Sequence, residues 1–163
     1  MAYSVTSAVI GAQPIADNST TQRHPLGYIV QGVDPTYGAG EFIYLQGIGS
    51  TVVGSIVNYD AAFVSALHTS ALDKPKPLAV AMAATVANQF GWYQISGQAI
   101  VVKSNALSLA AGEAIGATAG AAVVVATGSI LNGMIVAAVA SAVTASTSVR
   151  VMINRPHDTS DVS

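Results

Sequence analysis

The chain has 163 residues, 52% of them hydrophobic, with six basic and eight acidic side chains and no cysteine. The absence of cysteine excludes disulfides and thiolate metal sites, and the net charge of −2 with scattered Lys and Arg excludes the basic stripe of a nucleic-acid-binding protein. A monomer of this mass exposes roughly 7,500 Å² of surface. So few charges on that surface predict that other subunits cover much of it, as in a homo-oligomer or larger assembly.

Residues 1–36 are predicted to form an extended N-terminal arm. Pro14, Pro25 and Pro35 prevent a long helix there. The apolar residues of this segment are too many for a disordered tail, so we expect them to contact a neighbouring subunit. These candidate contact residues are Val5, Val9, Ile10, Ile15, Leu26, Ile29 and Val30.

Residues 37–154 are predicted to form a β domain. Its first two strands are expected at 41–45 and 51–59, joined as a hairpin through the glycines of 47–50. Residues 63–67 fit either a helical face or a short strand, and we favour the strand.

Further along the domain, residues 78–82 are expected to form a buried strand, followed by a helical turn at 83–89. The next strand is expected at 92–103, with Gly97 as a bulge or a point of close approach.

The stretch 104–149 carries one charged residue, Glu113, and no aromatic residue. Residues 121–143 are long enough to cross a bilayer as a helix, but Thr, Gly, Ser and Asn interrupt them and no basic or aromatic residue flanks them. We therefore expect no membrane partner. Strands are predicted at 122–126, 129–131 and 133–140, with a tight turn at Asn132-Gly133, and a last strand at 148–154 before a polar C-terminal tail, 155–163.

This density of strands and turns predicts an all-β fold, either an antiparallel β-sandwich or a small β-barrel.

The sequence offers little catalytic chemistry. No glycine spacing matches a phosphate loop, and no Gly-x-Ser-x-Gly nucleophile sequence is present. His24, His68 and His157 lie far apart along the chain, without a second ligand at metal-binding spacing. We therefore expect no enzyme activity, no cofactor and no metal.

The aromatic residues Phe90, Trp92 and Tyr93 have two readings. They could stack on a ligand, but bulky side chains at these positions more often fill a core or a subunit interface. We favour core or interface, because all ten aromatic residues precede Gln94 and few other large core-filling side chains are available.

Three stretches together resemble the head decoration, or cement, proteins of tailed bacteriophages. They are the sequence GVDPTYGAGEFIYL at 32–45, the residues from 80–82 to GWYQISG at 91–97, and AGE at 111–113 with GMIVA at 133–137. The resemblance implies an all-β protein that assembles as an intertwined homotrimer on the outer surface of an icosahedral head. It further implies binding across capsomers of the major capsid protein, with the N-terminal arm tying the trimer to the shell or to its neighbours.

An alternative function is a receptor- or carbohydrate-binding β module of a phage head or tail fibre. That function requires exposed aromatic side chains, so the exposure of Trp92 discriminates between the two.

Overall fold

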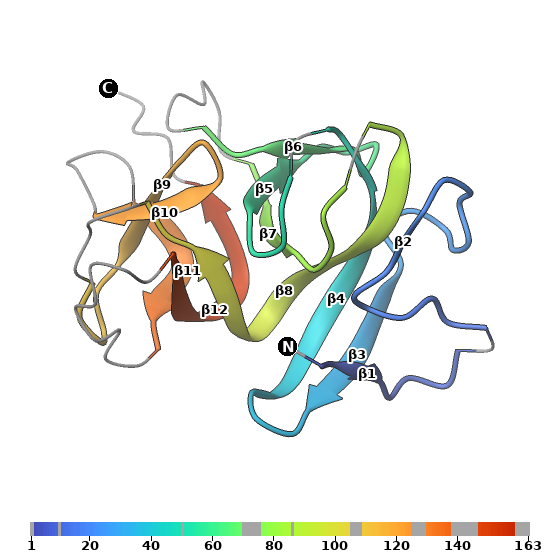
Figure 1. The fold of residues 1–163 in the computed structure, drawn as a ribbon, viewed down its shortest axis with the longest axis horizontal. Coiled ribbons are helices and arrows are strands. Elements are labelled where there is room, and N and C mark those ends of the chain that lie inside the picture. Colours follow the sequence, from blue (N-terminus) through green and yellow to red (C-terminus); the bar gives the residue numbers. More distant parts are fainter. Residues whose placement is uncertain are drawn as a thin grey trace.

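The computed structural model describes residues 2–9, 11–49, 51–69, 76–85, 87–104, 109–124, 130–137 and 147–158. These residues form twelve strands and no helix, which confirms the all-β prediction (Figure 1). The strands are β1 (Ser4–Val5), β2 (Asn18–Ser19), β3 (Ile29–Asp34), β4 (Gly38–Gly47), β5 (Ile56–Tyr59), β6 (Ser65–Leu67), β7 (Leu78–Ala81), β8 (Gln89–Val102), β9 (Ile115–Thr118), β10 (Ala121–Val124), β11 (Leu131–Val136) and β12 (Ser148–Asp158).

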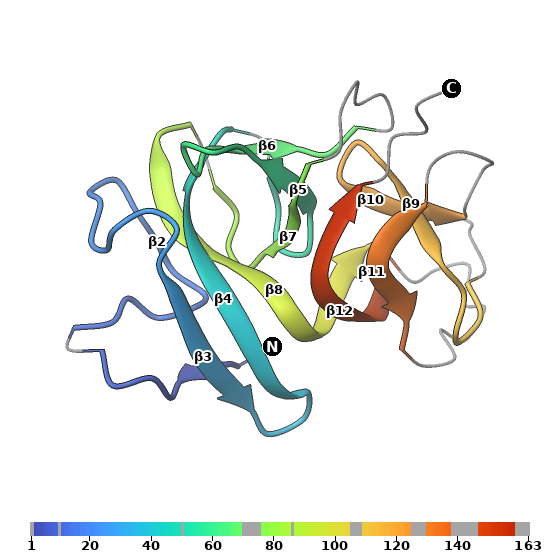
Figure 2. The ribbon, with the colours of Figure 1, turned by 180° about the vertical axis from the view of Figure 1, so that it is seen from behind.

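Ten of the strands form one antiparallel sheet. Its main path is β1-β3-β4-β8-β7-β5-β6, while β2 and β12 also pair with β8, and β11 pairs with β12. β9 and β10 form a separate two-stranded sheet. The long strand β8 therefore connects the N-terminal and C-terminal parts of the chain, as Figure 2 shows from behind.

β8 changes partner at its middle. Its first half pairs with β4 and its second half with β12, and Ser96 is opposite both Glu41 and Asn154. At Gly97 the backbone has a φ of +98°, and an added Cβ would lie 2.4 Å from the carbonyl oxygen of Ala39. Only glycine fits such a position, so the predicted close approach at Gly97 is confirmed.

The sheet curls almost into a barrel. β4, β8, β7, β5 and β6 follow one another, but β4 and β6 meet only through one isolated parallel bridge, Gln46 to Val64. The barrel is therefore not closed, and the small-barrel prediction is wrong in that respect.

Three hydrophobic clusters form the core. The curled strands enclose the inner cluster, which contains Ile43, Leu45, Val57, Ala79, Ala81, Tyr93 and Ile95. The other face of β4 and β8 supports the aromatic cluster of Tyr3, Ile15, Val30, Phe42, Tyr44, Met82 and Trp92. The C-terminal strands build the aliphatic cluster, among whose members are Val101, Ile115, Leu131, Met134, Val136, Val151 and Ile153.

Three local predictions are wrong. β4 and β5 do not pair with each other, because β8 is the main partner of β4 and β7 that of β5. Asn132 and Gly133 lie within β11 rather than at a chain reversal, although Gly133 has the predicted positive φ, +75°. The segment 83–89 contains no helical turn among its described residues.

Both predicted terminal segments contribute strands to the sheet. β1 pairs with β3, β3 pairs with β4, and β2 pairs with β8. At the other end, β12 continues four residues beyond the predicted strand end at Asn154, because His157 and Asp158 pair with Asn132 and Leu131 of β11. The rest of the predicted tail, 159–163, lies outside the described residues.

Candidate functional site

The candidate site lies where the outward face of β3 and β4 meets the C-terminal end of β12. The guanidinium Nη2 of Arg155 donates a hydrogen bond of 2.8 Å to Oε2 of Glu41, joining β12 to β4. Hollows lie on both sides of this ion pair, and Arg155 lines both of them.

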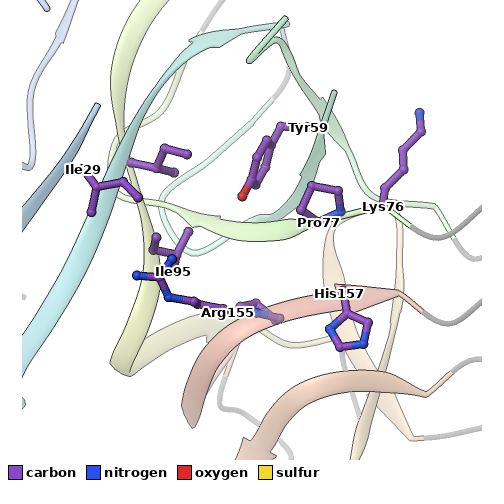
Figure 3. Close-up of a pocket in the computed structure, with 9 residues that line it drawn as sticks. Ile29, Tyr59, Lys76, Pro77, Ile95, Arg155 and His157 are labelled. Carbon is purple, nitrogen blue, oxygen red and sulfur yellow. The ribbon is translucent and has the colours of Figure 1, made fainter. Parts of the chain in front are cut away.

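We call the first hollow the Tyr59 pocket. It has a volume of about 360 Å³ and is drawn in Figure 3. Its apolar walls come from the inner cluster and two prolines, and its basic groups come from β12 and the residue before Pro77. The lining residues are Ile29, Ile43, Tyr59, Lys76, Pro77, Ile95, Arg155, Pro156 and His157.

Polar groups in this pocket are sparse. In Figure 3 the hydroxyl of Tyr59 points toward the strand that carries Arg155, and it makes no hydrogen bond to the described residues. Burial raises the pKa of Tyr59, and the positive charge of Arg155 opposes that shift in part. The phenol is therefore neutral at physiological pH and able to donate a hydrogen bond. The ammonium group of Lys76 extends away from the pocket, at its rim.

A β-bulge in β12 brings residues 155–157 to the pocket. Between the pairs Asn132–His157 and Met134–Ile153 the register shifts, so β12 has extra residues opposite Gly133. Arg155 has a φ of +43° in this bulge. An added Cβ on Gly133 would lie 2.6 Å from the carbonyl oxygen of Asn154, so glycine permits the close contact.

We call the second hollow the Gln31 groove. It has a volume of about 450 Å³ and lies between β3, β4, the middle of β8 and the end of β12. β3 alternates strictly, so Ile29, Gln31 and Val33 point outward. Ile29 is 39% exposed and Val33 is 44% exposed, which is high for large aliphatic side chains in a strand. The lining residues are Thr6, Gln31, Gly32, Val33, Ala39, Gly40, Glu41, Ser96, Asn154 and Arg155.

The structure separates the predicted arm residues into three groups. Ile15 and Val30 are buried in the aromatic cluster, and Val5, Val9 and Leu26 pack against it in half-buried positions. Ile10 lies outside the described residues. Among those described, Ile29 is the arm residue that reaches the candidate site from an exposed position.

The three predicted core or interface aromatics lie within this chain's own packing. Trp92 is 1% exposed, and its Nε1 donates a 2.9 Å hydrogen bond to the carbonyl of Gln13. The Tyr93 hydroxyl is hydrogen-bonded with Ser65 and Thr85, and Phe90 packs half-buried against the aromatic cluster. A ligand cannot stack on Trp92 in this structure.

His24 packs against the aromatic cluster. Its Nε2 accepts a hydrogen bond of 3.1 Å from the backbone N–H of Gln13, and its ring lies 5.3 Å from that of Trp92. Burial, and secondarily the charge of Arg23, lowers the pKa of His24. Burial also lowers the pKa of His68, against an opposing effect of Asp158.

The part of the chain that the structure describes contains no group of three or more His, Asp or Glu residues arranged to hold a metal ion. Within the same residues, no helix is long and apolar enough to span a membrane.

No protein-family model, curated protein or solved structure matches this chain.

Sequence reasoning did not place Tyr59, Arg155 and His157 at one pocket. The last strand was predicted to end at Asn154, with a polar tail from Arg155, and proline ordinarily interrupts a regular ladder. A bulge tolerates both Arg155 and Pro156, and this one continues β12 as far as Asp158.

Proposed function

We propose that this protein is a structural component of a virion, without catalytic activity, that decorates and stabilises an icosahedral phage head. It binds as a homotrimer across capsomers of the major capsid protein, on the outer surface of the capsid. The outward face of β3, with the Gln31 groove beside it, is the proposed contact surface.

The observation that supports this proposal is exposed apolar surface on a chain with very few charges. The whole chain has only six basic and eight acidic residues, while several large hydrophobic side chains are at least 39% exposed. Those side chains are Tyr28, Ile29, Val33, Ile48, Val52, Val53, Ile130, Ile135 and Met152. Covering them with a partner removes apolar area from water and stabilises the assembly by about 25 cal/mol per Å².

The stretch 32–45, whose sequence resembles that of cement proteins, includes part of the proposed contact surface. Residues 32–45 span the second half of β3, the turn and most of β4. Each contact of a cement protein is modest, but copy number and symmetry multiply its effect.

Point substitutions on β3 test the proposal. Removal of residues 1–36 does not, because β3 and the buried Ile15 and Val30 belong to this chain's own core. We expect Val33→Lys to reduce the number of copies bound to shells of the major capsid protein encoded in the same genome, measured by quantitative electrophoresis of purified particles. Val53→Lys, at a valine that is 55% exposed in the β4–β5 loop and lies outside the proposed contact surface, is the matched control and should bind normally. Unchanged occupancy with Val33→Lys would refute the proposed surface.

A further inference from the structure

We propose that the Tyr59 pocket is a binding site for a carboxylate carried on an apolar group. This inference does not rest on the proposed function. It concerns a hollow whose walls, charge and backbone geometry all favour one class of ligand.

The shape of the pocket suits a small apolar body. Its volume of about 360 Å³ lies at the lower end of the range of small-molecule sites. Ile43 and Ile95 form its floor as part of the inner cluster, and Ile29 and two prolines supply further apolar surface. A ligand that was charged throughout would find no compensating groups on these walls.

The polar groups favour a single negative charge. Arg155 and His157 line the pocket, Lys76 lies at its rim with the ammonium group turned outward, and no carboxylate residue lines it. A guanidinium has five N–H donors, and Glu41 accepts from one nitrogen of Arg155 outside the pocket lining. The remaining donors can therefore bind a carboxylate, with the Tyr59 hydroxyl as a second donor.

The backbone holds Arg155 at this place. Its positive φ, the register shift in β12 and the absence of a side chain at Gly133 together form the bulge. Bulges redirect side chains and occur frequently beside functional sites. The salt bridge to Glu41 further orients the guanidinium, so the entropy cost of ordering this side chain on ligand binding is small.

The test is a titration followed by ¹⁵N–¹H NMR with 4-phenylbutyrate as the probe and its neutral analogue 4-phenylbutyramide as the comparison. The proposal expects the acid to shift the amide signals of Ile29, Tyr59 and His157, with a Kd of about 1 mM or tighter. It expects the amide to bind at least about tenfold more weakly, since it has no charge to pair with Arg155.

Arg155→Gln should weaken the binding of 4-phenylbutyrate at least about tenfold, and Tyr59→Phe by less. Arg155 is 61% exposed, so its replacement should leave the fold intact, which the unchanged spectrum of distant residues verifies. Arg23→Gln is the matched control, because it removes the same charge from an exposed position outside the pocket and should not alter binding.

A capped dipeptide with a free C-terminal carboxylate, compared with its C-terminal amide, identifies the source of the ligand. Preference for the peptide acid alone indicates a protein chain end, and preference for both acids indicates that a free metabolite also fits; either result supports the site. The proposal is overturned if neither acid shifts the pocket signals at about 20 mM. It is also overturned if acid and amide bind equally, or if Arg155→Gln binds as the native chain does.

Discussion

The aromatic cluster and the aliphatic cluster stabilise the same sheet in different ways. The aromatic cluster contains Tyr3, Phe42, Tyr44 and Trp92, whereas the aliphatic cluster contains no aromatic residue. Rings in the first cluster pack at defined angles, such as the edge-on contact of Tyr44 with Trp92 at 4.9 Å.

The two clusters also differ in their hydrogen bonds. The backbone and side chain of Gln13 bind His24, Tyr44 and Trp92 within the aromatic cluster. Buried polar groups of this kind fix one arrangement, because a lost partner leaves an unsatisfied group. The aliphatic cluster relies on β-branched and small side chains that tolerate substitution of similar volume. The comparison therefore predicts that specificity resides mainly in the N-terminal half.

The largest expected effect is that of Trp92→Ala. The change removes the ring contacts with Tyr44 and His24 and the hydrogen bond to Gln13. We expect a loss of about 3–5 kcal/mol in the free energy of unfolding, measured by urea denaturation. A loss below about 1 kcal/mol would show that the aromatic cluster does not fix one arrangement of side chains more strongly than the aliphatic cluster does.

Gly97→Ala tests the point in β8 where the strand changes partner from β4 to β12. The substituted residue must keep a positive φ and would press its Cβ against the backbone of Ala39 and Gly40. We expect a loss of about 2–3 kcal/mol, from strain together with displacement of β4. Ala99→Gly, which removes a methyl group two residues away in β8, is a control for the strand's tolerance to mutation and should cost about 1 kcal/mol. Equal losses of stability for the two variants would contradict the claim that only glycine fits at position 97.

Gln13→Ala measures the contribution of the polar network. The hydroxyl of Tyr44 would lose its acceptor, the Oε1 of Gln13, at a distance of 3.0 Å. A loss of about 2 kcal/mol is expected, because the hydroxyl remains buried. If Gln13→Ala were as stable as the native chain by urea denaturation, the network would have no specific role.

A conservative change in the aliphatic cluster should matter least among the core variants. Ile153→Val removes one methylene from a side chain that is 1% exposed. The expected cost is about 1 kcal/mol by the same denaturation measurement. A cost equal to that of Trp92→Ala would abolish the contrast between the clusters.

His24 adds a small pH dependence to the aromatic cluster. Burial holds the pKa of the folded state below the ordinary value of 6.5, so the unfolded chain binds more protons at acidic pH. Its contribution to stability is fully present above pH 6.5 and is lost as the pH falls through the folded-state pKa. We expect His24→Gln, which keeps an acceptor for the N–H of Gln13, to lose less stability between neutral and acidic pH. An unchanged pH profile of the unfolding midpoint would contradict this.

Local chemistry allowed several features to be predicted from the sequence. The all-β class, the strand at 92–103 and the role of Gly97 follow from β-branched runs and glycine. Asp before Pro is typical of a turn in which the Asp side chain caps its own backbone, and the Oδ1 of Asp34 accepts from the N–H groups of Thr36 and Tyr37 at 2.7 and 3.0 Å.

Long-range pairing could not be predicted. Nothing local in 41–59 indicates that β8, far along the chain, separates β4 from β5 in the sheet. The Asn132-Gly133 pair shows the same limit, because a positive φ suits a turn and a bulge equally, and only the partner strand decides. The Tyr59 pocket was missed because six separate segments of the chain contribute to it.

Sedimentation velocity of the pure 163-residue chain at micromolar concentration tests the central claim most directly. The claim is that exposed apolar side chains such as Ile29 and Val33 are covered by other copies and by a shell. The account predicts a species of three times the 16.4 kDa chain mass. A single stable species of 16.4 kDa, unchanged with concentration, would contradict it.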